Sequence, residues 1–197
     1  MDQPKTQRGR QTRDAIVDAA AELMYERGVR ATSLDEVLLA ARAGKSQLYH
    51  YFDTKDDLVG AVLEHQLARV LDQQAEFPLK TWTGLHAWFD ALLEGQRRRA
   101  YRGCPVGSMA AEMSVMSSEM RARVGATFDR WQRTLTDSFA QMQARGRLAA
   151  DAQPELLAAV TLAQIQGGYL LSTASQSLEP MKQTLDAAYA TLRSYAP

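Results

Sequence analysis

The chain has 197 residues, of which 46 % are apolar, and its 23 basic side chains balance its 23 acidic ones. That length and apolar content suit one large helical domain, or a small domain joined to a larger one. A formal net charge of zero excludes a general attraction to nucleic acids or membranes, so any DNA-binding site must be local.

The cysteine content and the N-terminal segment indicate where the protein works. A single cysteine, Cys104, excludes an internal disulfide framework and fits a reducing compartment. Residues 1–13 are polar and lack the apolar region of a secretory signal. No stretch approaches the roughly 18 uninterrupted apolar residues of a membrane-spanning helix. We therefore expect a soluble, cytoplasmic protein.

The apolar residues take a helical spacing from Thr12 onward, after a polar segment at residues 1–11 that we expect to be a mobile arm. Gly28 ends the first predicted helix, and Ser33 with Glu36 three residues later fits a capping box at the second. The pattern predicts an all-α fold with helices at about 12–27, 34–41, 45–51, 54–74, 83–100, 108–116, 118–145, 154–173 and 180–195.

The second and third predicted helices are short and are joined by the tight turn Arg42-Ala43-Gly44, which is a helix-turn-helix pattern. The third helix offers donors and acceptors to base edges and phosphates from Lys45, Ser46, Gln47, Tyr49 and His50. Leu48, Tyr51 and Phe52 supply its packing side. From the pattern alone, a small helical corner with a solvated face is the alternative.

Two strings strengthen the DNA-binding interpretation. Thr32-Ser33-Leu34-Asp35-Glu36-Val37 is followed by Gly44-Lys45-Ser46-Gln47-Leu48-Tyr49-His50-Tyr51-Phe52 and then Lys55-Asp56-Asp57-Leu58. Over about residues 10–60 this segment closely resembles the DNA-binding head of the TetR family of transcriptional regulators. The Leu-Tyr-His-Tyr-Phe string followed by Lys55 is the most specific part of the resemblance.

The resemblance implies a role for each matching residue. Lys45, Ser46 and Gln47 face bases, while Thr32, Ser33, Tyr49, His50 and Lys55 contact phosphates. Leu34, Val37, Leu48 and Phe52 form the core of the head. Lys55 also has an independent rationale, because helix-end N–H groups and an ammonium both favour a phosphate.

Two features depart from the family pattern. Arg42 stands where the family usually has glycine, so either Arg42 or Gly44 must take any left-handed conformation. Asp35 and Glu36 lie near the DNA-facing end of their helix and would repel phosphates if they pointed outward. A packed histidine is the alternative for His50, whereas a metal site is not expected because the three histidines lack ligand spacing.

We assign residues 1–60 to a helix-turn-helix DNA-binding domain and residues 61–197 to a helical domain for effector binding and dimerisation. Methionine and aromatic side chains can line an adaptable apolar cavity, and an ordinary core is the alternative for each of them. The candidate effector pocket, which the resemblance implies without naming a ligand, comprises Trp88, Phe89, Met109, Met113, Met116, Phe128, Trp131 and Gln164.

Cys104 lies in a Gly-Cys-Pro-Val-Gly string that looks like the inter-helix segment of one branch of TetR-type regulators. Nearby arginines would lower the pKa of its thiol if they faced it, which raises redox or electrophile sensing as an alternative role. A structural thiol is the simpler interpretation.

The last two predicted helices carry regular stripes. Small residues recur every four positions in the first of them, and larger ones follow a heptad-like spacing in the second. Two such helices from each subunit form a four-helix bundle in a homodimer, with internal packing as the alternative. The predicted dimer seam comprises Ala159, Ala163, Gly167, Met181, Leu185 and Leu192.

Together these features predict a DNA-binding transcriptional repressor that a small apolar or amphipathic effector releases from a palindromic operator. The sequence has no phosphate-binding glycine loop, nucleophile elbow or metal cluster, so neither an enzyme nor a cofactor is expected. A helical interaction module without DNA binding is the remaining alternative.

Overall fold

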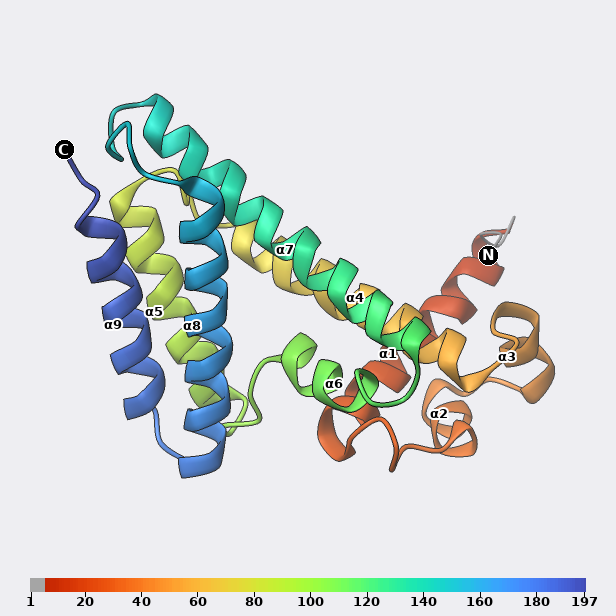
Figure 1. Ribbon diagram of the computed structural model, residues 1–197. Helices are drawn as coiled ribbons and strands as arrows, with labels where there is room; N and C mark the ends of the chain where they lie inside the picture. The colour runs from red at the N-terminus through yellow and green to blue at the C-terminus, as the bar shows by residue number, and fades with distance from the viewer. Residues whose placement is uncertain (1–5) are drawn as a thin grey trace. The chain divides into compact units, whose positions relative to one another are not determined.

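The computed structural model describes residues 6–197, which form helices and connecting loops without a strand. This confirms the predicted all-α fold. The helices are α1 (Gln7–Arg27), α2 (Leu34–Ala41), α3 (Lys45–Tyr51), α4 (Lys55–Ala75), α5 (Trp82–Arg98), α6 (Pro105–Met113), α7 (Ser118–Ala144), α8 (Pro154–Ser175) and α9 (Glu179–Arg193) (Figure 1).

The first helix begins earlier than the apolar spacing predicts. Thr6 is its N-cap, and the Thr6 hydroxyl accepts a hydrogen bond from the Gly9 N–H at 3.1 Å. This cap satisfies one of the free N–H groups at the helix start. The predicted arm is therefore wrong for residues 7–11, which are helical, while residues 1–5 lie outside the described part of the chain.

The sixth helix is shifted toward the N-terminus relative to its prediction. It begins at Pro105, which suits a first helical turn, and ends at Met113. Ser117 then caps the next helix by accepting a hydrogen bond from the Met120 N–H at 3.1 Å. Because the helix ends before Met116, this residue does not continue a helical stripe from Met109 and Met113.

The chain divides into two compact units. The first runs to Arg69 and resumes from Pro105 to Thr127, and the second comprises Val70–Cys104 and Phe128–Pro197. Helices α4 and α7 each pass from one unit into the other. The predicted division at residue 60 is continuous along the chain, whereas in the structure α6 and the start of α7 belong to the same compact unit as the N-terminal helices.

In the first unit, α1 packs against α2, α3 and α6. Its buried side chains recur with helical spacing and include Ile16, Ala20 and Met24. Leu48 and Phe52 on and after α3 are also buried. The short helices α2 and α3 thus keep their orientation through an apolar core.

In the second unit, α8 and α9 pack along each other and α5 lies against α9 (Figure 1). Gly168 permits this close packing, since a Cβ there would lie 2.3 Å from the Thr184 Oγ1. Met181, Leu185 and Leu192 on α9 are 0 %, 2 % and 1 % exposed. This corrects their assignment to a dimer seam, because a partner chain cannot reach side chains that already form the core of one chain.

Helix α8 is long and apolar enough to meet the length and composition criteria for a membrane span. The chain buries 44 % of its most apolar stretch. Core helices meet the same criteria, so this property is weak evidence for a membrane segment.

Candidate nucleic-acid interface

The turn between α2 and α3 sets the geometry of the candidate DNA-binding motif. Arg42 adopts the left-handed conformation with a φ of 51°, whereas Gly44 has a φ of −90°. The Ala43 N–H donates to the Leu38 carbonyl at 3.0 Å, which closes the end of α2. Of the two alternatives in the sequence, the non-glycine residue therefore takes the left-handed position.

Helix α3 separates polar from apolar side chains. Leu48 and Phe52 are 2 % and 1 % exposed. The Gln47 Oε1 accepts a hydrogen bond from the Gly44 N–H at 2.8 Å, so the NH₂ group of Gln47 is left as a donor. The exposed residues of this segment are the five predicted from the sequence, namely Lys45, Ser46, Gln47, Tyr49 and His50.

Lys45 forms an ion pair with an acid of the neighbouring helix. Its Nζ lies 3.0 Å from the Asp35 Oδ1, and both side chains are largely exposed. The hydrogen bond to Asp35 raises the pKa of Lys45, which further favours the charged ammonium that makes this ion pair. Asp35 therefore has a cation partner in the free protein, which answers the concern that it stands unopposed near the DNA-facing surface.

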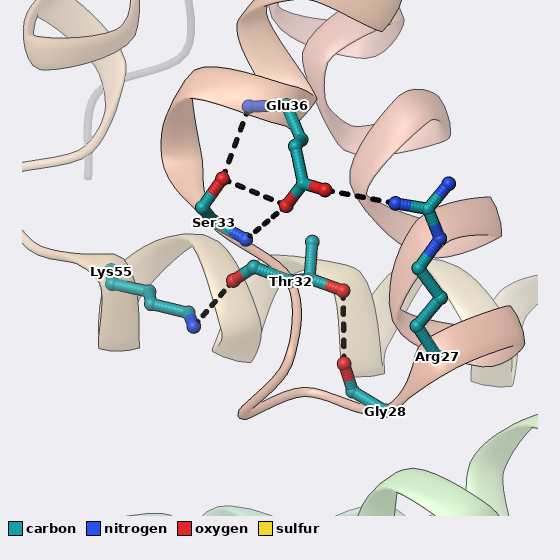
Figure 2. A network of polar contacts seen from close by, with 6 residues as sticks. All are labelled: Arg27, Gly28, Thr32, Ser33, Glu36 and Lys55. Atoms are coloured by element: carbon teal, nitrogen blue, oxygen red, sulfur yellow. Dashed lines mark hydrogen bonds and ion pairs between the residues drawn. The ribbon is translucent and has the colours of Figure 1, made fainter.

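The start of α2 is a complete capping box, as predicted (Figure 2). The Ser33 Oγ accepts a hydrogen bond from the Glu36 N–H at 3.3 Å, and the Ser33 N–H donates to the Glu36 Oε2 at 2.9 Å. Arg27 donates to the Glu36 Oε1 at 2.8 Å. The hydrogen bonds from the backbone and side chain of Ser33, and then Arg27, lower the pKa of Glu36. The second acid near the interface is thus engaged in holding the helix start.

Thr32 is buried, unlike the other residues for which the resemblance implies a phosphate contact. It is 1 % exposed, and its hydroxyl donates to the Gly28 carbonyl at 2.9 Å (Figure 2). A buried hydroxyl is not placed to reach a phosphate, so the predicted contact of Thr32 with DNA would have to involve its backbone. Lys55 is half-buried, and its Nζ donates to the Thr32 carbonyl at 2.6 Å. Two donors of the ammonium remain for other acceptors.

A residue far from the motif in sequence also reaches the head. The Val29 and Arg30 N–H groups, in the turn between α1 and α2, both donate to the Glu112 carboxylate at 3.1 Å. Glu112 lies on α6 in the same compact unit. Sequence reasoning missed its role because no local spacing links it to the turn, and Gly28 alone indicates no more than a helix stop.

Two regions of the chain match families of known proteins. Residues 16–62 match the bacterial regulatory proteins of the tetR family. Residues 82–187, more than half of the chain, match the C-terminal domain of LmrA/YxaF-like transcriptional regulators. The chain belongs to the TetR family of transcriptional regulators.

Individual TetR-family relatives extend this result. The transcriptional regulator AcuR of Cereibacter sphaeroides is 34 % identical over 149 residues, which cover 73 % of this chain and 68 % of AcuR. The HTH-type transcriptional repressor DhaR of a Mycobacterium species is 24 % identical over 187 residues and 91 % of each chain. A regulatory protein TetR from Rhodobacter sphaeroides has a similar crystal structure, with a TM-score of 0.77, 27 % identity and coverage of 90 % of this chain and 96 % of that one.

These comparisons confirm the resemblance inferred from the sequence. The matched families and relatives are transcriptional regulators and not enzymes. Within residues 6–197, no group of three or more histidine, cysteine or acidic side chains is placed to hold a metal ion.

The predicted effector-pocket residues belong to different units of this TetR-family chain. Met109, Met113 and Met116 are in the first unit, and the first two are buried. The remaining residues, Trp88, Phe89, Phe128, Trp131 and Gln164, belong to the second. Gln164 stands out because its Oε1 is buried and has no hydrogen-bond partner in the described part of the chain.

A groove of about 680 Å³ lies in the second unit, and its lining includes none of the predicted pocket residues. It lies between the end of α4, the following turn and α7. Its polar wall is already bonded: Gln74 accepts from the Trp131 Nε1–H at 2.8 Å and donates to the Thr134 Oγ1 at 2.9 Å. The lining residues are Leu71, Asp72, Gln74, Ala75, Glu76, Phe77, Pro78, Leu79, Lys80, Thr134, Ser138 and Gln141.

Cys104 is 3 % exposed, and its Sγ accepts a hydrogen bond from the Gln166 Nε2 at 3.6 Å. A buried thiol is poorly placed for reaction with soluble electrophiles, because reactive cysteines are partly exposed. Nothing in the structure favours the sensor alternative.

Helix α8 has an exposed apolar side in addition to the side that packs against α9. Leu156, Leu170 and Leu171 are 53 %, 70 % and 53 % exposed, and Val160 is 39 % exposed. Within the predicted seam of this helix, Ala163 is exposed while Ala159 and Gly167 are half-buried. The predicted seam does not include the exposed leucines.

Proposed function

We propose that this TetR-family regulator is a transcriptional repressor that binds a palindromic operator as a homodimer in the cytoplasm. The observation that carries the proposal is the polar surface of α3, where five side chains with donors or acceptors are exposed above a closed apolar core. A helix that reads DNA needs both kinds of side chain, because its apolar side must pack against the domain while its polar side reaches the base edges. The name of DhaR as a repressor supports repression over activation.

In this proposal Lys45, Ser46 and Gln47 face bases from the first turn of α3. Tyr49, His50, Ser33 and Lys55 contact phosphates, and Thr32 acts through its carbonyl, which holds the Lys55 ammonium. The family implies these roles, and the exposure of α3 supports them.

We assign dimerisation to the exposed apolar side of α8, with a second copy of this chain as the partner. Leu156, Val160, Leu170 and Leu171 expose apolar area that association with a partner would remove from water. Gly167 lies on the same helix, and a Cβ added there would meet nothing within 4 Å, which leaves room for a close approach. Two heads are needed because a palindrome presents two half-sites about 34–36 Å apart.

A small apolar or amphipathic effector is the proposed release signal, bound in the helical domain. The unpartnered Gln164 Oε1 supports this assignment, since buried acceptors are usually satisfied by protein, water or ligand. By linkage, an effector that prefers the non-binding state must bind less tightly to the operator complex, with a coupling of roughly 1–3 kcal/mol.

The DNA-binding proposal is tested by selecting bound sequences from a random DNA pool and measuring affinities for the selected site. Lys45→Ala and Tyr49→Phe are expected to weaken binding to that site by roughly tenfold each. Lys182→Ala, which removes an exposed lysine from α9, is the matched control and should leave affinity unchanged. Selection of no sequence, or equal affinity of all four proteins, would contradict the proposal.

The dimer proposal is tested by sedimentation of Gly167→Trp combined with Leu170→Glu. Position 167 has free space around it and Leu170 is largely exposed, so the variant should remain helical and sediment as a monomer. A variant that stays dimeric would place the interface elsewhere.

A further inference from the structure

The turn between α1 and α2 is held by a carboxylate from α6. The Glu112 Oε1 accepts from the Val29 N–H and its Oε2 from the Arg30 N–H, each at 3.1 Å. Val29 is 0 % exposed, so water cannot readily replace the acceptor that its N–H finds in Glu112. Bonds from N–H groups to an ionised carboxylate are among the stronger hydrogen bonds in proteins.

Gly28 adapts the turn to this carboxylate. It has a φ of +93°, and a Cβ at this position would lie 2.7 Å from the Glu112 Oε1. Its N–H donates to the Met24 carbonyl at 2.9 Å and closes α1. The backbone conformation therefore favours glycine here, and a Cβ would in addition push the Glu112 carboxylate out of its present position.

Two hydrogen bonds connect the same turn to the Lys55 ammonium, which is the proposed phosphate-binding group (Figure 2). The Gly28 carbonyl accepts from the Thr32 hydroxyl at 2.9 Å, and the Thr32 carbonyl accepts from the Lys55 Nζ at 2.6 Å. Lys55 forms no ion pair with a carboxylate in the described part of the chain, so its charge is oriented without being neutralised. The position of this charge depends on the turn that Glu112 holds.

We propose that Glu112 is a positioning residue for DNA binding, which sets the place of the Lys55 ammonium through the α1–α2 turn. The inference rests on the proposed DNA-binding function. The carboxylate is needed because it accepts two N–H bonds side by side, whereas a glutamine offers one oxygen and an NH₂ group that would face an N–H donor. A residue of α6 thereby belongs to the DNA-binding apparatus without touching DNA.

The test measures affinity for the selected operator at several salt concentrations. Glu112→Gln is expected to lower affinity by about tenfold. It should also reduce the slope of log affinity against log salt by about one unit, because one phosphate contact is lost. Lys55→Met should show the same loss of slope, and adding Glu112→Gln to Lys55→Met should change little further. Glu155→Gln, at an exposed position on α8, is the control and should behave like the wild type.

The slope and the double variant distinguish positioning from a general loss of stability. A merely destabilised head would lower the active fraction at every salt concentration and leave the slope intact. An unchanged slope, or effects of Glu112→Gln and Lys55→Met that simply add, would overturn the inference. If Glu112→Gln does not fold, Glu112→Asp replaces it: partial losses of affinity and slope are expected, and wild-type values would overturn the inference. A wild-type protein that selects no DNA would instead refute the proposed function.

Discussion

Two successive glycines of α8 face different surroundings, and alanine at each should have a different effect. At Gly168 an added Cβ would lie 2.3 Å from the Thr184 Oγ1 and 3.3 Å from the Met181 Cα. At Gly167 the same atom would meet nothing within 4 Å. We therefore expect Gly167→Ala to stabilise the fold of the single chain and Gly168→Ala to destabilise it.

The magnitude follows from a comparison of the two sites. Replacing a mid-helix glycine by alanine gains roughly 0.5–1 kcal/mol, and this gain is shared by both variants. Overpacking adds a cost of about 1–3 kcal/mol at position 168 alone. Thr184 cannot rotate away without loss, because its hydroxyl donates to the Pro180 and Met181 carbonyls at 3.1 Å and 2.9 Å. The difference between the variants is therefore about 1–3 kcal/mol.

Urea denaturation of both variants, followed by helical circular dichroism, measures this difference. Several protein concentrations are needed, since dimerisation adds a concentration-dependent stability. Gly168→Ala combined with Thr184→Ala should recover part of the loss, because the nearest atom is then absent. If Gly168→Ala proves as stable as Gly167→Ala, the close packing of α8 on α9 described above is wrong.

Two further changes test other contacts. Gln74→Leu leaves the buried Trp131 indole N–H without its acceptor and should cost about 1–3 kcal/mol of unfolding free energy in thermal unfolding. The cost of Gln74→Leu should be smaller in a Trp131→Phe background, where there is no indole N–H to satisfy. Glu36 has its pKa lowered below 4.5 by hydrogen bonds from Ser33, so its stabilisation is present above pH 4.5 and is lost as the pH falls through the folded-state pKa. The difference in unfolding midpoint between the wild type and Glu36→Gln should thus shrink below about pH 4.5; a constant difference would refute this.

The elements that the sequence predicted well are those set by neighbours along the chain. The bounds of α2 and α3 were predicted at 34–41 and 45–51, where the structure has them. A hydroxyl cap, an apolar spacing and a tight turn all act within a few residues, so they are visible without knowledge of the fold. The exposure of the polar side chains of α3 followed from the same local pattern.

The sequence was less informative about side chains whose surroundings are set by distant parts of the fold. The stripe of Met181, Leu185 and Leu192 has the same spacing whether its own chain or a partner buries it, and here its own chain does so, with α8 and α5 packed against α9. Thr32 matches the family string, yet its hydroxyl turns inward to the Gly28 carbonyl. Glu112 is about 80 positions from its partners, and no periodicity reports such a contact.

The placement of acids explains how a chain of zero net charge can present a site for a polyanion. Glu36 and Asp57 accept hydrogen bonds from N–H groups at the starts of α2 and α4, where helix dipoles favour negative charge. Glu112 accepts two more in the turn before α2. Lys55 instead donates to a neutral carbonyl and keeps its charge for an external partner. Long-range attraction contributes little to such a protein, so its affinity for DNA must come from a few placed contacts, and each one lost should be a large part of the whole.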